Sequence, residues 1–434
     1  MFSVFWTACA ILLGKMSVPK TINLAGSIKG QLPAEIIEFI KKAGDTAEKQ
    51  QQRLYLVGGV VRDLLLERRN IDLDMVGEGD AIKLAQEIAG VNQGEVITHP
   101  RFGTAKLKWG KRSTDFASAR AETYLRPGAL PTVRAGTIRD DLARRDFSIN
   151  AMAIELNPRR YGELIDPFGG REDLDKKLVR VLHEKSFTDD ATRIWRALRY
   201  EQRLDFKIEP VTLLLIKRDL NMLKTISGDR IRHELELVLK EELPEKALQR
   251  AEEIGALAKL HPALKGDDWL LETFAAAREQ RKTDEPHPQL YMSLLCYRLT
   301  AKESEQLIKY LRLPKATAQV LRDTLTIKGK TKELSTPGQS PSVIYDILHG
   351  YCLTAYIANS LGAGSETAAE HIELYLNVLR HVKPALTGED LVKLGVPRGP
   401  KIKEVLQKLR EARLDGRIDS KKGEEEMVRG LIKK

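Results

Sequence analysis

The chain has 434 residues, of which 42% are hydrophobic, 30% are charged and only 6% are aromatic. This balance excludes a disordered chain and fits roughly two to four folded domains. The formal net charge of +10 favours a polyanionic partner. The three cysteines and eight histidines show neither a disulfide framework nor zinc-ligand spacing. We therefore expect a cytoplasmic protein with no membrane association and no obligate protein partner.

The first predicted feature is an apolar run over residues 1–13. It is too short to span a bilayer, and no basic residue precedes it as in a signal peptide. Met16 then opens a polar stretch, so we expect translation to begin at Met16. A native N-terminal peptide containing Phe5 would contradict this start.

The remaining pattern places strands early and helices late, which predicts an α+β head followed by an all-α neck, body and tail. Apolar periodicity and turn residues predict helices over 34–52, 61–68, 80–89 and 138–147. They predict one strand that begins at residue 54, a second that contains residues 72–74, and further strands over 95–98, 104–108, 113–118 and 151–155. A loop is expected around Pro127, Gly128 and Pro131, and a strand with two turns over 158–170. From Thr188 to the end the pattern is helical.

Two aspartates at alternate positions are the most informative part of this pattern. On a strand, Asp72 and Asp74 point to one face, while Ile71, Leu73 and Met75 point to the buried face. An isolated Asp-x-Asp is usually a solvated strand edge. Paired carboxylates beside apolar residues, however, suit Mg²⁺, which prefers hard oxygen ligands. We predict that Asp72 and Asp74 bind Mg²⁺.

A glycine pair lies about a dozen residues before the aspartates. Gly58 and Gly59 follow a predicted strand and precede a helix, so backbone N–H groups there can approach a phosphate. Arg62 lies in the first helical turn, where its guanidinium can bind phosphate oxygens bidentately. Taken alone, a glycine pair is usually only a turn. Combined with the aspartates, it predicts a nucleotidyltransferase site.

These residues carry a family resemblance. VGGVVRDLLL (57–66) followed by DLD (72–74) resembles the signature of class II tRNA nucleotidyltransferases, the CCA-adding enzymes, which share a polymerase-β-like head with bacterial poly(A) polymerases. Four further blocks agree in order: RRDFSINAMA (144–153), IDPFGG (165–170), DDATRIWRALRY (189–200) and RIRHEL (230–235). GEDLVKLG (388–395) is a looser match in the C-terminal half. The resemblance implies a nucleotidyltransferase head over 30–155, a helical neck with a base-selecting helix over 156–250, and a tRNA-binding body and tail over 251–434.

The expected reaction is metal-assisted transfer of a nucleotide from CTP or ATP to the 3′ acceptor end of tRNA, with release of pyrophosphate. Such sites commonly use a third carboxylate from a neighbouring strand, and Asp115 is the candidate. The resemblance assigns Arg145 to the nucleotide, and Asp146 and Asn150 to the ribose and the fold. Asp146 and Asn150 are four residues apart, so we expect them to meet only if the segment is helical.

Asp190 and Arg193 are the candidate base-selecting pair. Three residues apart on a helix, they would be neighbours, and a carboxylate with a guanidinium matches the donor and acceptor edges of both cytosine and adenine. The resemblance also implies that Arg196 and Arg199 reach the triphosphate or nearby acidic groups. The family commonly has Glu-Asp where this chain has Asp189-Asp190, which leaves the role of Asp189 open.

Four activities remain open on the sequence alone. The first is full CCA addition, and the second is partial addition of only CC or only A, which segments 70–80 and 129–133 resemble. The third is a poly(A) polymerase, which often carries a long basic extension that is absent here. The fourth is a tRNA-binding protein with a decayed head, against which Asp72, Asp74 and Asp115 argue.

Overall fold

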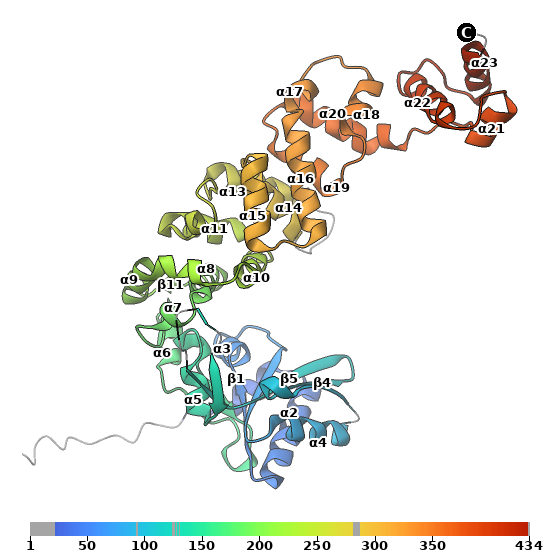
Figure 1. The fold of residues 1–434 in the computed structure, drawn as a ribbon. Helices are drawn as coiled ribbons and strands as arrows, with labels where there is room; N and C mark the ends of the chain where they lie inside the picture. The colour runs from blue at the N-terminus through green and yellow to red at the C-terminus, as the bar shows by residue number, and fades with distance from the viewer. Residues whose placement is uncertain are drawn as a thin grey trace, which may run out of the picture. The chain divides into compact units, whose positions relative to one another are not determined.

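The computed structural model describes residues 22–280 and 287–432, apart from 93, 124, 125, 127 and 130. The N-terminal run and the start proposed at Met16 lie outside these residues. The chain forms two compact units, Met1–Thr225 and Ile226–Lys434, coloured from blue to green and from green to red in Figure 1. The boundary between them falls within the predicted neck, and the division into head, neck and body stays a prediction.

A seven-stranded mixed sheet forms the centre of the first unit, in the order β3-β4-β5-β2-β1-β8-β9. The strands are β1 (Arg53–Val57), β2 (Leu73–Glu78), β3 (Glu95–His99), β4 (Thr104–Trp109), β5 (Arg112–Ser118), β8 (Ala153–Glu155) and β9 (Leu164–Ile165). β1 pairs antiparallel with β2 and β8, whereas β2 pairs parallel with β5. The predicted α+β class is confirmed.

Helices cover the sheet and connect its strands (Figure 1). α1 (Ala25–Gln31), α2 (Ala34–Lys49), α3 (Gly59–Leu65), α4 (Ala81–Asn92) and α5 (Ile138–Ala143) lie in this part of the chain. Tyr55, Val57 and Val76 of the sheet pack with Ile138 and Leu142 of α5 in one buried cluster. A short ribbon of β6 (Arg120–Thr123) and β7 (Thr132–Ala135) flanks the predicted loop.

The strand with the paired aspartates starts later than predicted. β2 begins at Leu73, so Asp72 lies just before the strand rather than within it. Leu73 and Met75 are buried as expected, but Ile71 is 52% exposed, and its predicted burial is wrong. Strand alternation does not extend to Ile71, because the residues before Leu73 are not paired in the sheet.

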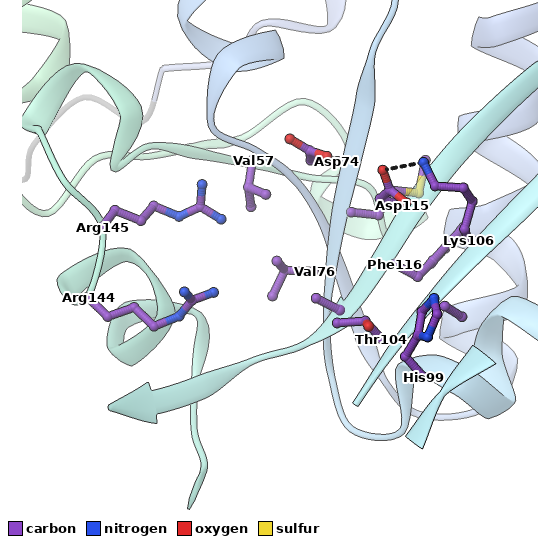
Figure 2. Close-up of a pocket in the computed structure, with 13 residues that line it drawn as sticks. Val57, Asp74, Val76, His99, Thr104, Lys106, Asp115, Phe116, Arg144 and Arg145 are labelled. Atoms are coloured by element: carbon purple, nitrogen blue, oxygen red, sulfur yellow. Dashed lines mark hydrogen bonds and ion pairs between the residues drawn. The ribbon is translucent and has the colours of Figure 1, made fainter. Parts of the chain in front are cut away.

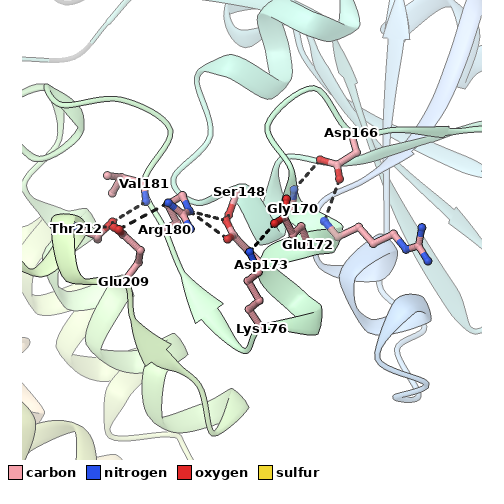
Figure 3. Close-up of polar contacts among 11 residues, drawn as sticks. Ser148, Asp166, Gly170, Glu172, Asp173, Lys176, Arg180, Val181, Glu209 and Thr212 are labelled. Atoms are coloured by element: carbon pink, nitrogen blue, oxygen red, sulfur yellow. Dashed lines mark hydrogen bonds and ion pairs between the residues drawn. The ribbon is translucent and has the colours of Figure 1, made fainter. Parts of the chain in front are cut away.

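The end of the first unit is a helical segment joined to the 3₁₀ turn η2 (Ser148–Asn150) of the head by polar contacts. It contains α6 (Gly170–Asp175), α7 (Ser186–Asp189), α8 (Thr192–Leu204), α9 (Pro210–Asp219) and the 3₁₀ helix η4 (Leu220–Thr225), together with a small parallel pair, β10 (Leu178–Val179) and β11 (Lys207–Ile208), that was not predicted. Further 3₁₀ turns are η1 (Pro100–Phe102), η2 (Ser148–Asn150) and η3 (Pro158–Arg160). Asp173 of α6 accepts hydrogen bonds from Ser148 (2.5 Å) and Arg180 (3.0 Å), and Arg180 reaches Glu209 beside α9 at 3.6 Å (Figure 3). These contacts tie the segment to η2 of the head.

The second unit is helical throughout its described residues, as predicted. Its helices are α10 (Gly228–Val238), α11 (Pro244–Ile254), α12 (Ala256–Leu260), α13 (Asp268–Glu279), α14 (Pro288–Cys296), α15 (Ala301–Leu311), α16 (Lys315–Gly329), α17 (Thr331–Leu334), α18 (Pro341–Leu348), α19 (Leu353–Gly362), α20 (Glu366–Asn377), η5 (Leu379–His381), α21 (Gly388–Lys393), α22 (Pro400–Leu414) and α23 (Lys421–Ile432). Apolar clusters hold it together, one of them around Leu391, Leu409 and Val428. Among the described helices, none has the length and apolar character needed to cross a membrane.

Candidate active site

Two adjacent parallel strands bring two of the predicted carboxylates together. In the register of β2 and β5, Asp74 lies directly opposite Asp115, so both side chains point to the same face of the sheet. Lys106 of the next strand, β4, faces Asp115 in turn, and its Nζ lies 3.0 Å from Asp115 Oδ2. These three side chains form one wall of a cavity of about 320 Å³ (Figure 2).

The electrostatics of this wall favour a cation. The pKa of Asp74 is raised, first by its partial removal from solvent and then by the neighbouring charges of Asp115 and Asp72, while Arg145 and Lys106 oppose the increase. Like charges that lie close together raise a carboxyl pKa because ionisation is unfavourable without a counter-ion. A bound divalent cation would remove this penalty.

Two arginines face the carboxylates from the opposite side of the cavity. Arg144 and Arg145 follow α5, and in Figure 2 Arg145 extends toward Val57 and Asp74 while Arg144 extends toward Val76. Both are held by Asp141 of α5, whose carboxylate is fully buried: Arg144 Nη2 lies 2.6 Å from Oδ1 and Arg145 Nη2 lies 3.0 Å from Oδ2. Positive charge on this wall can bind phosphate oxygens. The position of Arg145 supports its predicted role toward the nucleotide.

The glycine pair follows directly after Val57, which lines the cavity, but the backbone N–H of Gly58 is already hydrogen-bonded within the protein. Gly58 has φ +72° and ψ −129°, a conformation that suits glycine, and a Cβ there would lie 2.8 Å from Arg145 Nη1. Its N–H already donates to the Met152 carbonyl at 3.3 Å. The geometry therefore gives no direct support for a phosphate contact by the Gly58 amide, and phosphate binding by the glycine pair stays a prediction; Gly58 leaves room for Arg145.

Arg62 starts from the first turn of α3 as predicted, but its surroundings differ. It is only 4% exposed and donates to both oxygens of Asp63 (2.8 and 2.9 Å) and to Asn150 Oδ1 (2.8 Å). Its guanidinium also lies 5.3 Å from the ring centroid of Tyr200. Arg62 does not line the cavity, so phosphate binding by this residue stays a prediction without direct support from the geometry.

Asp146 and Asn150 meet, although the segment between them is not an α-helix. Asn150 Nδ2 donates to Asp146 Oδ1 at 3.0 Å across an extended Phe147 and the 3₁₀ turn η2, so the expectation that contact requires a helix is wrong. Burial opposes ionisation of Asp146, but Arg196, with Nη2 at 2.6 Å, and Asn150 hold the pKa of Asp146 below its ordinary value. Arg196 thus reaches an acidic group, as one of its two predicted roles requires.

The base-selecting pair is arranged differently from the prediction. Asp190 lies before α8 in an extended conformation, and its carboxylate accepts from the Thr192 N–H (3.0 Å) and hydroxyl (2.6 Å). Arg193 is 5% exposed and donates to Ser186 Oγ (2.8 Å) and the Arg144 carbonyl (2.7 Å). The expected i,i+3 placement on one helix is therefore wrong. Base selection by these residues stays a prediction, as does a nucleotide contact by the buried Arg199, which lies 4.9 Å from the Tyr200 ring centroid.

Asp74 and Asp115 fit a metal ion in chemistry, and both line the cavity. Asp74 and Asp115 are oxygen donors on neighbouring strands, and Asp72 lies two residues before Asp74 in the chain. Within the part of the chain that the structure describes, no three His, Cys, Asp or Glu side chains come close enough to hold a metal together. A metal here would therefore take its remaining ligands from water or substrate.

Sequence reasoning missed three residues of the cavity and its support. Lys106 and Arg144 line the cavity, and Asp141 positions both arginines. The spacing of Asp141 three and four residues before Arg144 and Arg145 was a usable signal, because such pairs meet at the end of a helix. Lys106 could be found only from strand pairing, since its partner Asp115 lies on another strand.

Together, the mixed sheet, the paired carboxylates and the facing arginines define a nucleotidyltransferase. The comparisons with known proteins agree. Residues 54–180 match the poly(A) polymerase head domain, and residues 205–267 match a probable RNA- and SrmB-binding site of polymerase A. An A-adding tRNA nucleotidyltransferase of Halalkalibacterium halodurans is 34% identical over 92% of this chain and 93% of its own length, and a CCA-adding enzyme of Geobacillus stearothermophilus is 28% identical over 89% and 93%. The structure of a Thermotoga maritima CCA-adding enzyme complexed with tRNA covers 95% of this chain and 100% of its own, with 29% identity and a TM-score of 0.77. The chain belongs to the class II tRNA nucleotidyltransferase family.

Proposed function

We propose that the protein extends the 3′ end of tRNA with nucleotides taken from ATP or CTP, and that it adds the terminal A. The observation that carries the activity is the cavity in which Asp74 and Asp115 face Arg145. The choice of A is supported by 34% identity to the A-adding relative over 92% of the chain, compared with 28% over 89% for the CCA-adding relative and 34% over only 56% for a CC-adding relative of Deinococcus radiodurans. Full CCA addition is the second candidate, because the CCA-adding relative also matches over 89% of the chain.

In this proposal Asp72 and Asp74 would hold Mg²⁺, with Asp115 as the neighbouring carboxylate and the remaining ligand positions taken by water or substrate. The metal would supply charge stabilisation for the attacking and leaving oxygens. The 3′ oxygen forms a bond to the α-phosphorus, the bond to the pyrophosphate oxygen breaks, and the hydroxyl proton is released. Arg145 would bind phosphate oxygens, because it lies across the cavity from the carboxylates and its Nη1 lies against Gly58.

The remaining assignments are those that the sequence suggested. Asp190 and Arg193 would select the base only if Arg193 gives up its bond to the Arg144 carbonyl. Asp146 and Asn150 would support the ribose side of the site, and a cytoplasmic location follows from a tRNA substrate.

The test uses tRNA transcripts that end at the discriminator base, at C or at CC, each incubated with ATP, with CTP or with both. Extension of only the CC-ended transcript by one A establishes A addition. Three-nucleotide extension of the shortest transcript that requires both nucleotides establishes CCA addition and contradicts the proposed preference. Long A tails indicate a poly(A) polymerase, and failure to extend any transcript overturns the proposed activity.

A further inference from the structure

A network of hydrogen-bonded side chains begins at the backbone N–H of the first aspartate, Asp72. The Asp72 N–H donates to Asn70 Oδ1 at 2.9 Å, and Asn70 Nδ2 donates to Asp63 Oδ2 at 2.7 Å. Asp63 in turn accepts two bonds from Arg62, at 2.8 and 2.9 Å. This half of the hydrogen-bond network connects Asp72, the residue before β2, to Asp63 and Arg62 of α3.

The second half continues from α3 to α8. Arg62 Nη1 donates to Asn150 Oδ1 at 2.8 Å, Asn150 Nδ2 donates to Asp146 Oδ1 at 3.0 Å, and Arg196 Nε donates to Asp146 Oδ2 at 2.8 Å. Arg196 lies on α8, the helix that begins beside the predicted base-selecting residues. One end of the hydrogen-bond network therefore lies just before β2 and the other lies on α8, the two elements that the proposed reaction must align.

Each asparagine in the network accepts a hydrogen bond on its oxygen and donates one from its nitrogen. Neither an aliphatic side chain nor an ionised carboxylate can do both, so replacing Asn70 or Asn150 with Ala or Asp removes at least one of the two bonds. Arg62, Asp63, Asn150 and Asp146 are all between 4% and 7% exposed. Buried networks of this kind hold their members in one arrangement, because each lost bond leaves an unsatisfied polar group.

The central members do not line the cavity that contains Asp74 and Arg145. Their arrangement is that of residues that act through others. We propose that Asn70, Asp63 and Arg62 are positioning residues that hold the backbone at Asp72, where the chain enters the strand that carries Asp74, in place for metal binding and couple it to α8. The inference rests on the proposed function and adds a route by which the metal-binding and base-selecting parts of the site are aligned.

The first experiment compares Asn70→Ala with a matched control, Asn157→Ala. Asn157 makes the same two kinds of bond elsewhere in the unit: it accepts from the Leu54 N–H at 2.9 Å and donates to Glu48 at 2.8 Å. Loss of a residue that orients a metal ligand typically costs about 10–100-fold in metal affinity or activity. We expect Asn70→Ala to weaken Mn²⁺ binding about 10-fold in isothermal titration calorimetry of the nucleotide-free protein. The same variant should lower kcat by a similar factor, with KM for ATP nearly unchanged.

Asn157→Ala should lower Tm without changing Mn²⁺ affinity. If the two variants bind Mn²⁺ equally well, the positioning role is overturned, whereas an inactive wild-type protein would instead overturn the proposed function. Asn70→Asp is a second variant in case Asn70→Ala does not fold. It keeps the acceptor for the Asp72 N–H but puts a carboxylate beside Asp63, and it should also weaken binding.

A double-mutant cycle tests whether the two halves of the hydrogen-bond network act together on kcat. If Asn70 and Asn150 act through Arg62 and Asp63, the Asn70→Ala/Asn150→Ala double variant should lose less kcat than the product of the two single losses. Losses that multiply would show independent sites and overturn the coupling.

Discussion

The two compact units use buried charge in different ways. Among the described residues, every buried arginine lies in the first unit: Arg62, Arg193 and Arg199. The buried charged residues described in the second unit are all acidic, and two of them bind backbone amides. Glu424 accepts from the N–H groups of Ala385 and Leu386, both at 2.8 Å.

The buried charges discussed in the two units bind different kinds of partner. In the first unit the buried charges of Arg62 and Asp146 contact other buried side chains. In the second unit Glu424 and Asp323 satisfy amides where one helix gives way to the next, and Asp323 does so for the Cys352 N–H at 3.0 Å. Burial of a charge is costly in both cases, but only the first arrangement fixes the geometry of reacting groups.

The largest contrast should come from neutralising one carboxylate in each unit. Asp74→Asn removes half of the paired charge in the cavity, and we expect kcat to fall on the order of 10²–10³-fold or more, because electrostatic stabilisation of this kind is worth that much. Asp323→Asn should lower Tm but keep most of the activity. Single-turnover extension of tRNA with ATP measures the activity of both variants, thermal unfolding measures Tm, and tRNA binding by Asp74→Asn should match wild type.

Asp72→Ala should likewise abolish transfer and leave tRNA binding intact. Retained activity would place the metal elsewhere.

A second contrast concerns the buried acids that contact arginines. Asp141→Asn leaves Arg144 and Arg145 without their shared carboxylate, and we expect a loss of about 3–5 kcal/mol in the free energy of unfolding together with a raised KM for ATP. Glu424 has a similar cost of removal, since it pairs with Arg413. Urea unfolding and steady-state kinetics of Asp141→Asn and Glu424→Gln separate the two effects. A raised KM in Glu424→Gln would contradict the separation.

Two glycines with positive φ allow a smaller and cleaner contrast. Gly58→Ala places a methyl group 2.8 Å from Arg145 Nη1, whereas a methyl group at Gly350, with φ +100°, would meet no described atom within 4 Å outside its own chain neighbours. Both substitutions should cost about 1–2 kcal/mol of stability through backbone strain. Only Gly58→Ala should reduce kcat/KM for ATP, by roughly 10-fold, the equivalent of about 1.4 kcal/mol. Equal activity in both variants would show that Arg145 adjusts freely.

The smallest effect is a pH dependence. The pKa of Asp146 is lowered in the fold, so its contribution to stability is present above the unfolded-state pKa near 4 and is lost as the pH falls through the folded-state value. Asp146→Asn should therefore flatten the loss of stability between about pH 5 and pH 2. Glu305, which is paired with Arg322 at the surface of the second unit, has its pKa shifted in the same direction, but solvent screening makes its effect smaller. Urea midpoints of Asp146→Asn and Glu305→Gln across this range test the order.

The sequence was most informative where local pattern and chemistry coincide. Alternation predicted that Asp74 points away from the buried face of β2, the expected third carboxylate on a neighbouring strand predicted Asp115 on β5, and periodicity predicted the helical second unit. It failed where a side chain is controlled by a distant group. Arg193 is held by the carbonyl of Arg144, 49 positions away, and Arg62 by Asn150, 88 positions away. A local i,i+3 rule cannot anticipate such partners, and the same holds for the start of α8, where Asp190 caps the helix instead of joining it.

The pairing of β10 with β11 has a consequence for the motion of α8. β10 lies before the segment that contains α7 and α8, and β11 lies after it. Their parallel pairing therefore holds the two ends of this segment together. Because the core face of α8 is also buried at Ile194, Trp195 and Leu198, the helix can open only with the strand pair or by wider unfolding. Amide hydrogens of α8 should therefore exchange with solvent as one cooperative group, together with those of Val179 and Ile208, rather than fraying from Thr192 one turn at a time.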